Sequence, residues 1–164
     1  MKAFISEDDI EQALCNHLAQ PEFDWKRIEC DPSPDKKDDV SKTGRTNSSE
    51  CILPMVFYNA LKRLNPNVSQ QYLDSILQEF RKDYSGTDII DTNYKFYNKI
   101  RNGIKIDTRT KKGDDFDIVK LIDFDNIDNN DFHCVNQMWI KGRFSYRRPD
   151  VLLFINGLPV VFIE

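Results

Sequence analysis

The chain has 164 residues, of which 40% are hydrophobic and 12% aromatic, and this is enough for one domain with a packed core. Charged residues make up 30% and the net charge is -4, so a polyanionic partner would need a local basic patch. No apolar run reaches the ~20 residues of a membrane span, and the N-terminus lacks a signal-peptide apolar core. The four cysteines are widely spaced without a Cys-x-x-Cys pair, which favours reduced cysteines in a cytoplasmic protein over zinc or disulfides.

The first fifty residues predict a helix, a short strand and a loop. Apolar residues at helical spacing, with an N-cap at Ser6 and Asp9 three positions later, predict a helix over 6–19. A strand is predicted over 25–30. The polar, turn-rich stretch 31–50 is predicted to be a mobile loop.

The apolar period changes from 3.6 to 2 after Gly103. Before it, the segment 52–102 predicts three helices that form a helical insertion. After it, the pattern predicts a turn over 110–114 and strands over 104–107, 117–124 and 132–140. We expect the late strands, in 104–164, to form one sheet. The fold class is then α/β or α+β, with a mixed sheet flanked by helices.

The closing segment 147–164 predicts two apolar strands joined by a turn at Asn156-Gly157. An acid stands at each outer end, Asp150 and Glu164. A carboxylate beside such apolar strands is costly unless something compensates its charge, and a shared divalent cation would do so. The sequence also stops within the second apolar strand, so we expect the chain to be a fragment of a longer protein.

The register of this hairpin is a testable condition for a metal site. With a plain two-residue turn, Asp150 lies opposite Ile163, and the two acids point to opposite faces. A three-residue connection or a β-bulge instead sets Asp150 opposite Glu164 on one face. Two carboxylates placed so can bridge Mg²⁺, which suits phosphodiester hydrolysis. A metal site therefore predicts an odd loop or a bulge.

Pro149-Asp150 followed by Glu164 resembles the PD-(D/E)xK nuclease motif, cut before its lysine. The segments 130–137 and 148–164 closely resemble the N-terminal nuclease domain of the R (restriction, DNA-translocating) subunit of type I restriction endonucleases. The segments 64–66 and 93–105 resemble the helical part of the same family. The resemblance covers most of the chain outside 31–50.

This resemblance implies a PD-(D/E)xK domain over 1–164 that cuts double-stranded DNA with Mg²⁺. In such subunits ATP-driven motor domains follow, and the complex includes methyltransferase and specificity subunits in the prokaryotic cytoplasm. The metal ligands carry over to Asp150 and Glu164. The motif lysine would lie two residues beyond Glu164, so we expect the fragment alone to be inactive.

Four further residues are weaker candidates. Related nucleases place an acid of the first helix against the metal, and Glu7 is the best match, with Glu11 second; first-turn acids also occur simply because they favour the helix dipole. Arg147 and Arg148 are candidates for DNA phosphate contacts, or they simply face water. Asn136-Gln137 is interpreted as a packing feature rather than part of a site.

Two other functions stay open at this point. One is a non-catalytic DNA-binding or scaffold domain that contacts the motor and the methyltransferase. The other is a standalone resolvase-like or repair nuclease with the same motif. Motor motifs in the same protein, and a lysine two positions beyond Glu164, discriminate among the three.

Overall fold

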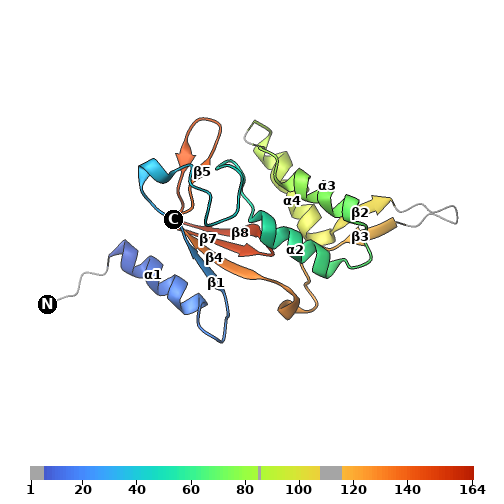
Figure 1. Cartoon of the computed structure of the whole chain (residues 1–164), viewed down its shortest axis with the longest axis horizontal. Helices are drawn as coiled ribbons and strands as arrows, with labels where there is room; N and C mark the ends of the chain where they lie inside the picture. The colour runs from blue at the N-terminus through green and yellow to red at the C-terminus, as the bar shows by residue number, and fades with distance from the viewer. Residues whose placement is uncertain (1–5, 85, 108–115) are drawn as a thin grey trace.

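The computed structural model describes residues 6–84, 86–107 and 116–164, and the predicted turn over 110–114 lies outside them. Its centre is a four-stranded sheet in the order β1-β4-β7-β8 (Figure 1). The strands are β1 (Lys26–Glu29), β4 (Phe132–Asn136), β7 (Val151–Ile155) and β8 (Leu158–Ile163). β1 runs parallel to β4, whereas the β4–β7 and β7–β8 pairs are antiparallel, so the sheet is mixed as predicted.

Helix α1 (Glu7–Leu18) lies beside this sheet (Figure 1) and begins as the sequence predicts. The Ser6 hydroxyl accepts a hydrogen bond from the Asp9 backbone N–H at 3.1 Å, and the Asp9 carboxylate accepts one from the Ser6 N–H at 2.9 Å. This reciprocal capping box satisfies two of the backbone donors that a helix start leaves unpaired. Cys15 on the inner face of α1 is buried against Cys134 of β4 and Val151 of β7, and this contact fixes α1 on the sheet.

The three predicted helices of the middle segment are present as α2 (Pro54–Leu64), α3 (Gln70–Phe80) and α4 (Ile89–Asn102). Buried residues of α2 and α3, among them Phe57 and Phe80, form one apolar cluster with Leu158 of β8. Half-buried Phe96 and Ile100 of α4 pack against this cluster. Because Leu158 belongs to the closing hairpin, the helices pack on the turn end of that hairpin. None of the described helices combines the length and the apolar character needed to cross a membrane.

The prediction that the late strands form one sheet is wrong for the described residues. β2 (Ile104–Asp107) and β3 (Phe116–Val119) pair only with each other, as do β5 (Ile140–Lys141) and β6 (Tyr146–Arg147). The strand predicted over 117–124 stops after Val119. The Asn65 side chain there accepts from the Lys120 N–H at 2.7 Å and donates to the Lys120 carbonyl at 2.8 Å. These bonds use the backbone groups that a continued strand pair would need.

The loop segment 31–50 contains one short 3-10 turn, η1 (Pro34–Lys36), and a buried arginine. The Arg45 guanidinium donates to the backbone carbonyls of Glu50 and Trp139, each at 3.0 Å. A second 3-10 turn, η2 (Ile127–Asn129), precedes β4. The loop is therefore tied to the segment that joins β4 to β5, close to the outer ends of the central strands.

Candidate functional site

The turn of the closing hairpin is held on three sides. Asn156 and Gly157 have φ angles of 51° and 77°, which is the backbone form that a two-residue hairpin turn favours. The Asn156 amide donates to the Leu121 carbonyl at 2.9 Å and accepts from the Asp131 N–H at 2.8 Å, while the Gly157 carbonyl accepts from the Leu53 N–H at 2.9 Å. The turn is fixed, and the register of β7 and β8 is fixed with it.

The turn also contacts an ion-paired carboxylate that makes stability depend on pH. Asp131 accepts from Arg63 at 2.8 Å and lies 3.4 Å from the Lys26 ammonium. Partial burial alone would raise the pKa of Asp131, but the hydrogen bond and charge of Arg63, with Lys26, outweigh burial and hold that pKa below its ordinary value.

Because the pKa of Asp131 is lowered in the folded state, its contribution to stability is present above the unfolded-state pKa, about 4, and is lost as the pH falls through the folded-state value. We expect the free energy of unfolding to decrease on acidification below about pH 4. In urea titrations at several pH values, Asp131→Asn should show a shallower decrease than the unsubstituted chain. Equal slopes would contradict this role of Asp131.

The predicted β-bulge is present. Ile155 pairs with Leu158 across the two-residue turn, but the register shifts between Leu153 and Phe154, so that Val160 is an extra residue in β8. As a result Val151 pairs with Ile163, where the ladder ends. Continuing the same register by one residue would set Asp150 opposite Glu164. Directly opposed residues point to the same face of a sheet, so this register would bring the two acids to one face.

A glutamine at the end of β4 joins Asp150 to an acid on α1. Gln137 follows Asn136, the last residue of β4, and its backbone N–H donates to the Asp150 carbonyl at 3.0 Å. Its side-chain Nε2 donates to Asp150 Oδ1 at 3.3 Å and to Glu11 Oε2 at 2.7 Å. One NH₂ group therefore bridges two carboxylates from different elements.

The other oxygen of Glu11 is held as well. Glu11 Oε1 accepts from the buried Asn136 amide at 2.6 Å, and Asn136 Oδ1 accepts from Arg27 Nε at 3.3 Å. The Arg27 guanidinium also donates to Gln12 and Asn16 of α1, at 2.5 and 2.9 Å. These bonds fix the position of Glu11 along α1 relative to β1 and β4.

A family model described as "Type I restriction enzyme R protein N terminus" matches residues 4–164. The chain belongs to this family. It is 29% identical over 161 residues to the type I restriction enzyme HindI endonuclease subunit of Haemophilus influenzae, a match covering 98% of this chain and 15% of that protein. It is 33% identical over 128 residues to the putative type I restriction enzyme MjaIXP endonuclease subunit of Methanocaldococcus jannaschii, covering 73% of this chain and 12% of that protein. The chain thus spans about one seventh of the length of the first of these relatives.

The structure places the other predicted residues of this R protein N-terminal chain as follows. Glu7 is exposed in the first turn of α1, and Glu11, one turn further along, makes the contact to Gln137. Arg147 ends β6 and is exposed. Arg148 is also exposed, lies 5.2 Å from the Trp139 ring and donates to the Pro32 carbonyl at 2.7 Å. Part of the Arg148 side chain is therefore occupied by contacts within the protein.

The groups around Asp150 are of the type that Mg²⁺ prefers, although three acids do not meet. Within the described ranges, no three His, Cys, Asp or Glu side chains come close enough together to hold a metal ion. The structure has instead a pair of carboxylates, Glu11 and Asp150, bridged by the NH₂ group of Gln137. The other atom of that carboxamide, Oε1, is buried and has no hydrogen-bond partner. Carboxylate and amide oxygens are the hard ligands of Mg²⁺. In donor type, these residues of the R protein N-terminal chain fit the cation.

The sequence interpretation of Asn136-Gln137 as a packing feature missed their contacts to Glu11. Asn136 is fully buried, but both side chains bond to the acid on α1. The signal available in the sequence was position, because two amide side chains stand at the end of an apolar strand. The structure adds that Gln137 has a left-handed φ of 55°. A non-glycine residue in that conformation often marks a functional position.

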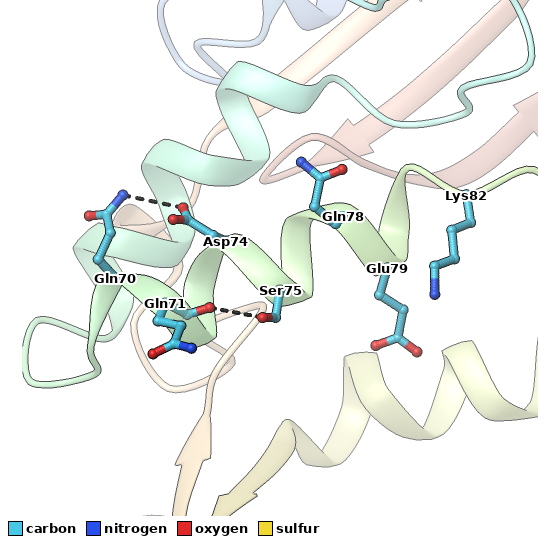
Figure 2. Close-up of a pocket in the computed structure, with 7 residues that line it drawn as sticks. All are labelled: Gln70, Gln71, Asp74, Ser75, Gln78, Glu79 and Lys82. Atoms are coloured by element: carbon cyan, nitrogen blue, oxygen red, sulfur yellow. Dashed lines mark hydrogen bonds between the residues drawn. The ribbon is translucent and has the colours of Figure 1, made fainter.

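A hollow on the surface of α3 holds none of these residues. Figure 2 shows that it is lined by polar side chains of α3 and by Lys82. Gln70 donates to Asp74 at 3.2 Å, and the Ser75 hydroxyl donates to the Gln71 carbonyl at 2.9 Å, so several of its polar groups bond within the helix (Figure 2). We assign no ligand to this hollow.

Proposed function

We propose that this chain is the DNA-cleaving PD-(D/E)xK domain of a type I restriction enzyme R subunit, acting in the cytoplasm of a prokaryotic cell. The observation that supports the proposal is the register of β7 and β8, in which a bulge at Val160 pairs Val151 with Ile163, the residues next to Asp150 and Glu164. A bulge on an edge strand next to a site commonly re-aims side chains toward the chemistry. The family, whose relatives are named endonuclease subunits, supports the same function.

In this proposal Asp150 and Glu11 would hold Mg²⁺ against a scissile phosphate of double-stranded DNA, and Glu164 would join them when the cation draws the three acids together. The cation, when bound, polarises a phosphoryl oxygen and generates a nucleophile from a bound water. Asp150 and Glu164, at the ends of two paired strands, would orient the cation, and Glu11 would reach it from α1. In the full protein, cleavage is coupled to ATP-driven translocation, and methyltransferase and specificity subunits complete the complex.

The third acid can be identified by a matched pair of substitutions in the full-length R subunit that carries this chain. We expect Glu11→Gln to slow DNA cleavage by about 10–100-fold, the usual cost of disturbing groups around a metal. Glu7→Gln, one turn away and exposed, should cleave at nearly the unsubstituted rate. The measurement is linearisation of a plasmid in the assembled complex. If Glu7→Gln slows cleavage and Glu11→Gln does not, the third acid is Glu7. If neither substitution changes the cleavage rate, α1 contributes no acid to the site.

The turn between β5 and β6 is proposed as a DNA contact beside the acids. It exposes Phe144 almost completely, at 89%, and the Arg143 guanidinium lies 5.0 Å from that ring. The ammonium groups of Lys37 and Lys141 lie 4.9 and 5.8 Å from the Tyr146 ring. This turn is therefore a local basic and aromatic surface on a chain of net charge -4, and 147–149 connect it directly to Asp150.

Arg147→Ala tests that contact, because Arg147 is exposed. If Arg147 pairs with one phosphate, the slope of log affinity against log salt should become shallower by about one unit. The measurement is fluorescence anisotropy of a labelled duplex at several salt concentrations, with the full-length subunit. Arg101→Ala on α4 is the matched control, since Arg101 contacts Tyr97 far along the chain from the acids. An unchanged slope for Arg147→Ala would exclude that phosphate contact.

A further inference from the structure

The Gln137 carboxamide is placed where it acts on both acids at once. Its Nε2 donates to Glu11 on α1 and to Asp150 before β7, so the carboxylates are separated by at most the sum of those two bonds, 2.7 and 3.3 Å. Two like charges this close repel each other, and they need a positive or donating group between them. In this structure the NH₂ group of Gln137 is that group.

The other end of the same carboxamide is unsatisfied. Gln137 Oε1 is buried and has no hydrogen-bond partner, although leaving a buried acceptor unpaired is unfavourable. The backbone of Gln137 is also in the left-handed region, which is unfavourable for a side chain with a Cβ atom. Packing alone does not explain the buried oxygen, because an apolar side chain of the size of leucine would fill the same space without an unpaired acceptor.

We propose that Gln137 is a neutral ligand of the cation site, which bridges Glu11 and Asp150 without a cation and supplies Oε1 as an oxygen donor when a divalent cation binds. The inference rests on the proposed function. The terminal torsion of a glutamine is soft, so the carboxamide can turn over and exchange its nitrogen and oxygen positions. The exchange breaks the two Nε2 bonds to Glu11 and Asp150, which the cation would replace, and it breaks no protein bond at the position of Oε1.

Two substitutions of Gln137 separate this role from packing, because they should change cation affinity in opposite directions. Gln137→Glu keeps an oxygen donor and adds charge, and we expect Mn²⁺ to bind about tenfold or more tightly. Gln137→Leu removes both the bridge and the donor, and we expect Mn²⁺ to bind about 10–100-fold more weakly. Affinity is measured as the loss of the free Mn²⁺ electron paramagnetic resonance signal during titration of the chain with Mn²⁺ alone.

A matched control and a folding check accompany these variants. Gln78→Glu adds the same charge on the exposed face of α3, so it should leave Mn²⁺ affinity within about twofold. Circular dichroism establishes that each variant is folded before titration, and Gln137→Met replaces Gln137→Leu if that variant unfolds.

The outcomes distinguish the inference from the proposed function. If Asp150→Asn weakens Mn²⁺ binding but both Gln137 variants bind as the unsubstituted chain does, or both shift in the same direction, the role of Gln137 is overturned and the site stands. If the unsubstituted chain and Asp150→Asn bind Mn²⁺ equally, or neither binds it, the cation site itself is wrong. Opposite shifts at Gln137 together with weaker binding by Asp150→Asn support both.

Discussion

Replacing Asp150 by asparagine in the full-length R subunit that carries this chain is expected to abolish DNA cleavage while ATP hydrolysis persists. Asparagine keeps the size of the side chain and an oxygen that accepts from Gln137 Nε2, so the local hydrogen bond is retained. It loses the negative charge that a hard divalent cation requires. We expect cleavage to fall by at least about a hundredfold, as when one key electrostatic group of an active site is removed.

The measurement follows plasmid cleavage and ATP turnover in the same reaction of the assembled complex. Asp128→Asn in η2 is a suitable control, because this exposed acid lies before β4 and outside the candidate site. Continued cleavage by Asp150→Asn would refute the assignment. Loss of ATP hydrolysis together with cleavage would indicate a damaged complex rather than a removed metal ligand.

Replacing Gly157 by alanine is expected to destabilise the chain by about 2–5 kcal/mol, a large part of the typical total of 5–15 kcal/mol. A Cβ atom on Gly157 would lie 2.6 Å from the Leu53 carbonyl oxygen and 2.7 Å from the Phe57 nitrogen. Both are backbone atoms at the start of α2, so neither can rotate away. The positive φ of 77° adds the usual cost of a left-handed alanine.

Urea unfolding monitored by circular dichroism measures this cost, and Gly86→Ala is the matched control. A Cβ on Gly86 has no neighbour within 4 Å, so that substitution should change stability by less than about 1 kcal/mol. Equal stabilities of the two variants would show that the Asn156-Gly157 turn is not held against α2 as described. Loss of the turn would also release the register that aligns Asp150 with Glu164.

Local patterns predicted much of the fold. The capping box at Ser6 and the short turn at Asn156-Gly157 are properties of adjacent residues, and both are confirmed. The bulge was predicted only as a condition for a metal site, and the structure confirms it without testing the metal. The residue that forms it, Val160, follows Pro159, and a proline within a strand favours an edge position or a bulge.

Contacts between distant residues could not be predicted. The strand after Asp117 ends early because Asn65, 55 positions away, binds the backbone of Lys120. Gln137 reaches Glu11 across 126 positions, whereas the sequence ranked Glu7 above Glu11. Only the packing of α1 on β4 shows which turn of the helix stands beside Asp150.

Anomalous diffraction from crystals grown with Mn²⁺ tests the central claim most directly, because it locates the cation without relying on activity. We predict a peak about 2 Å from an Asp150 carboxylate oxygen, with oxygens of Glu164 and Glu11 among its other protein ligands. A cation bound elsewhere, with none at Asp150 under saturating Mn²⁺, would contradict the proposed nuclease site.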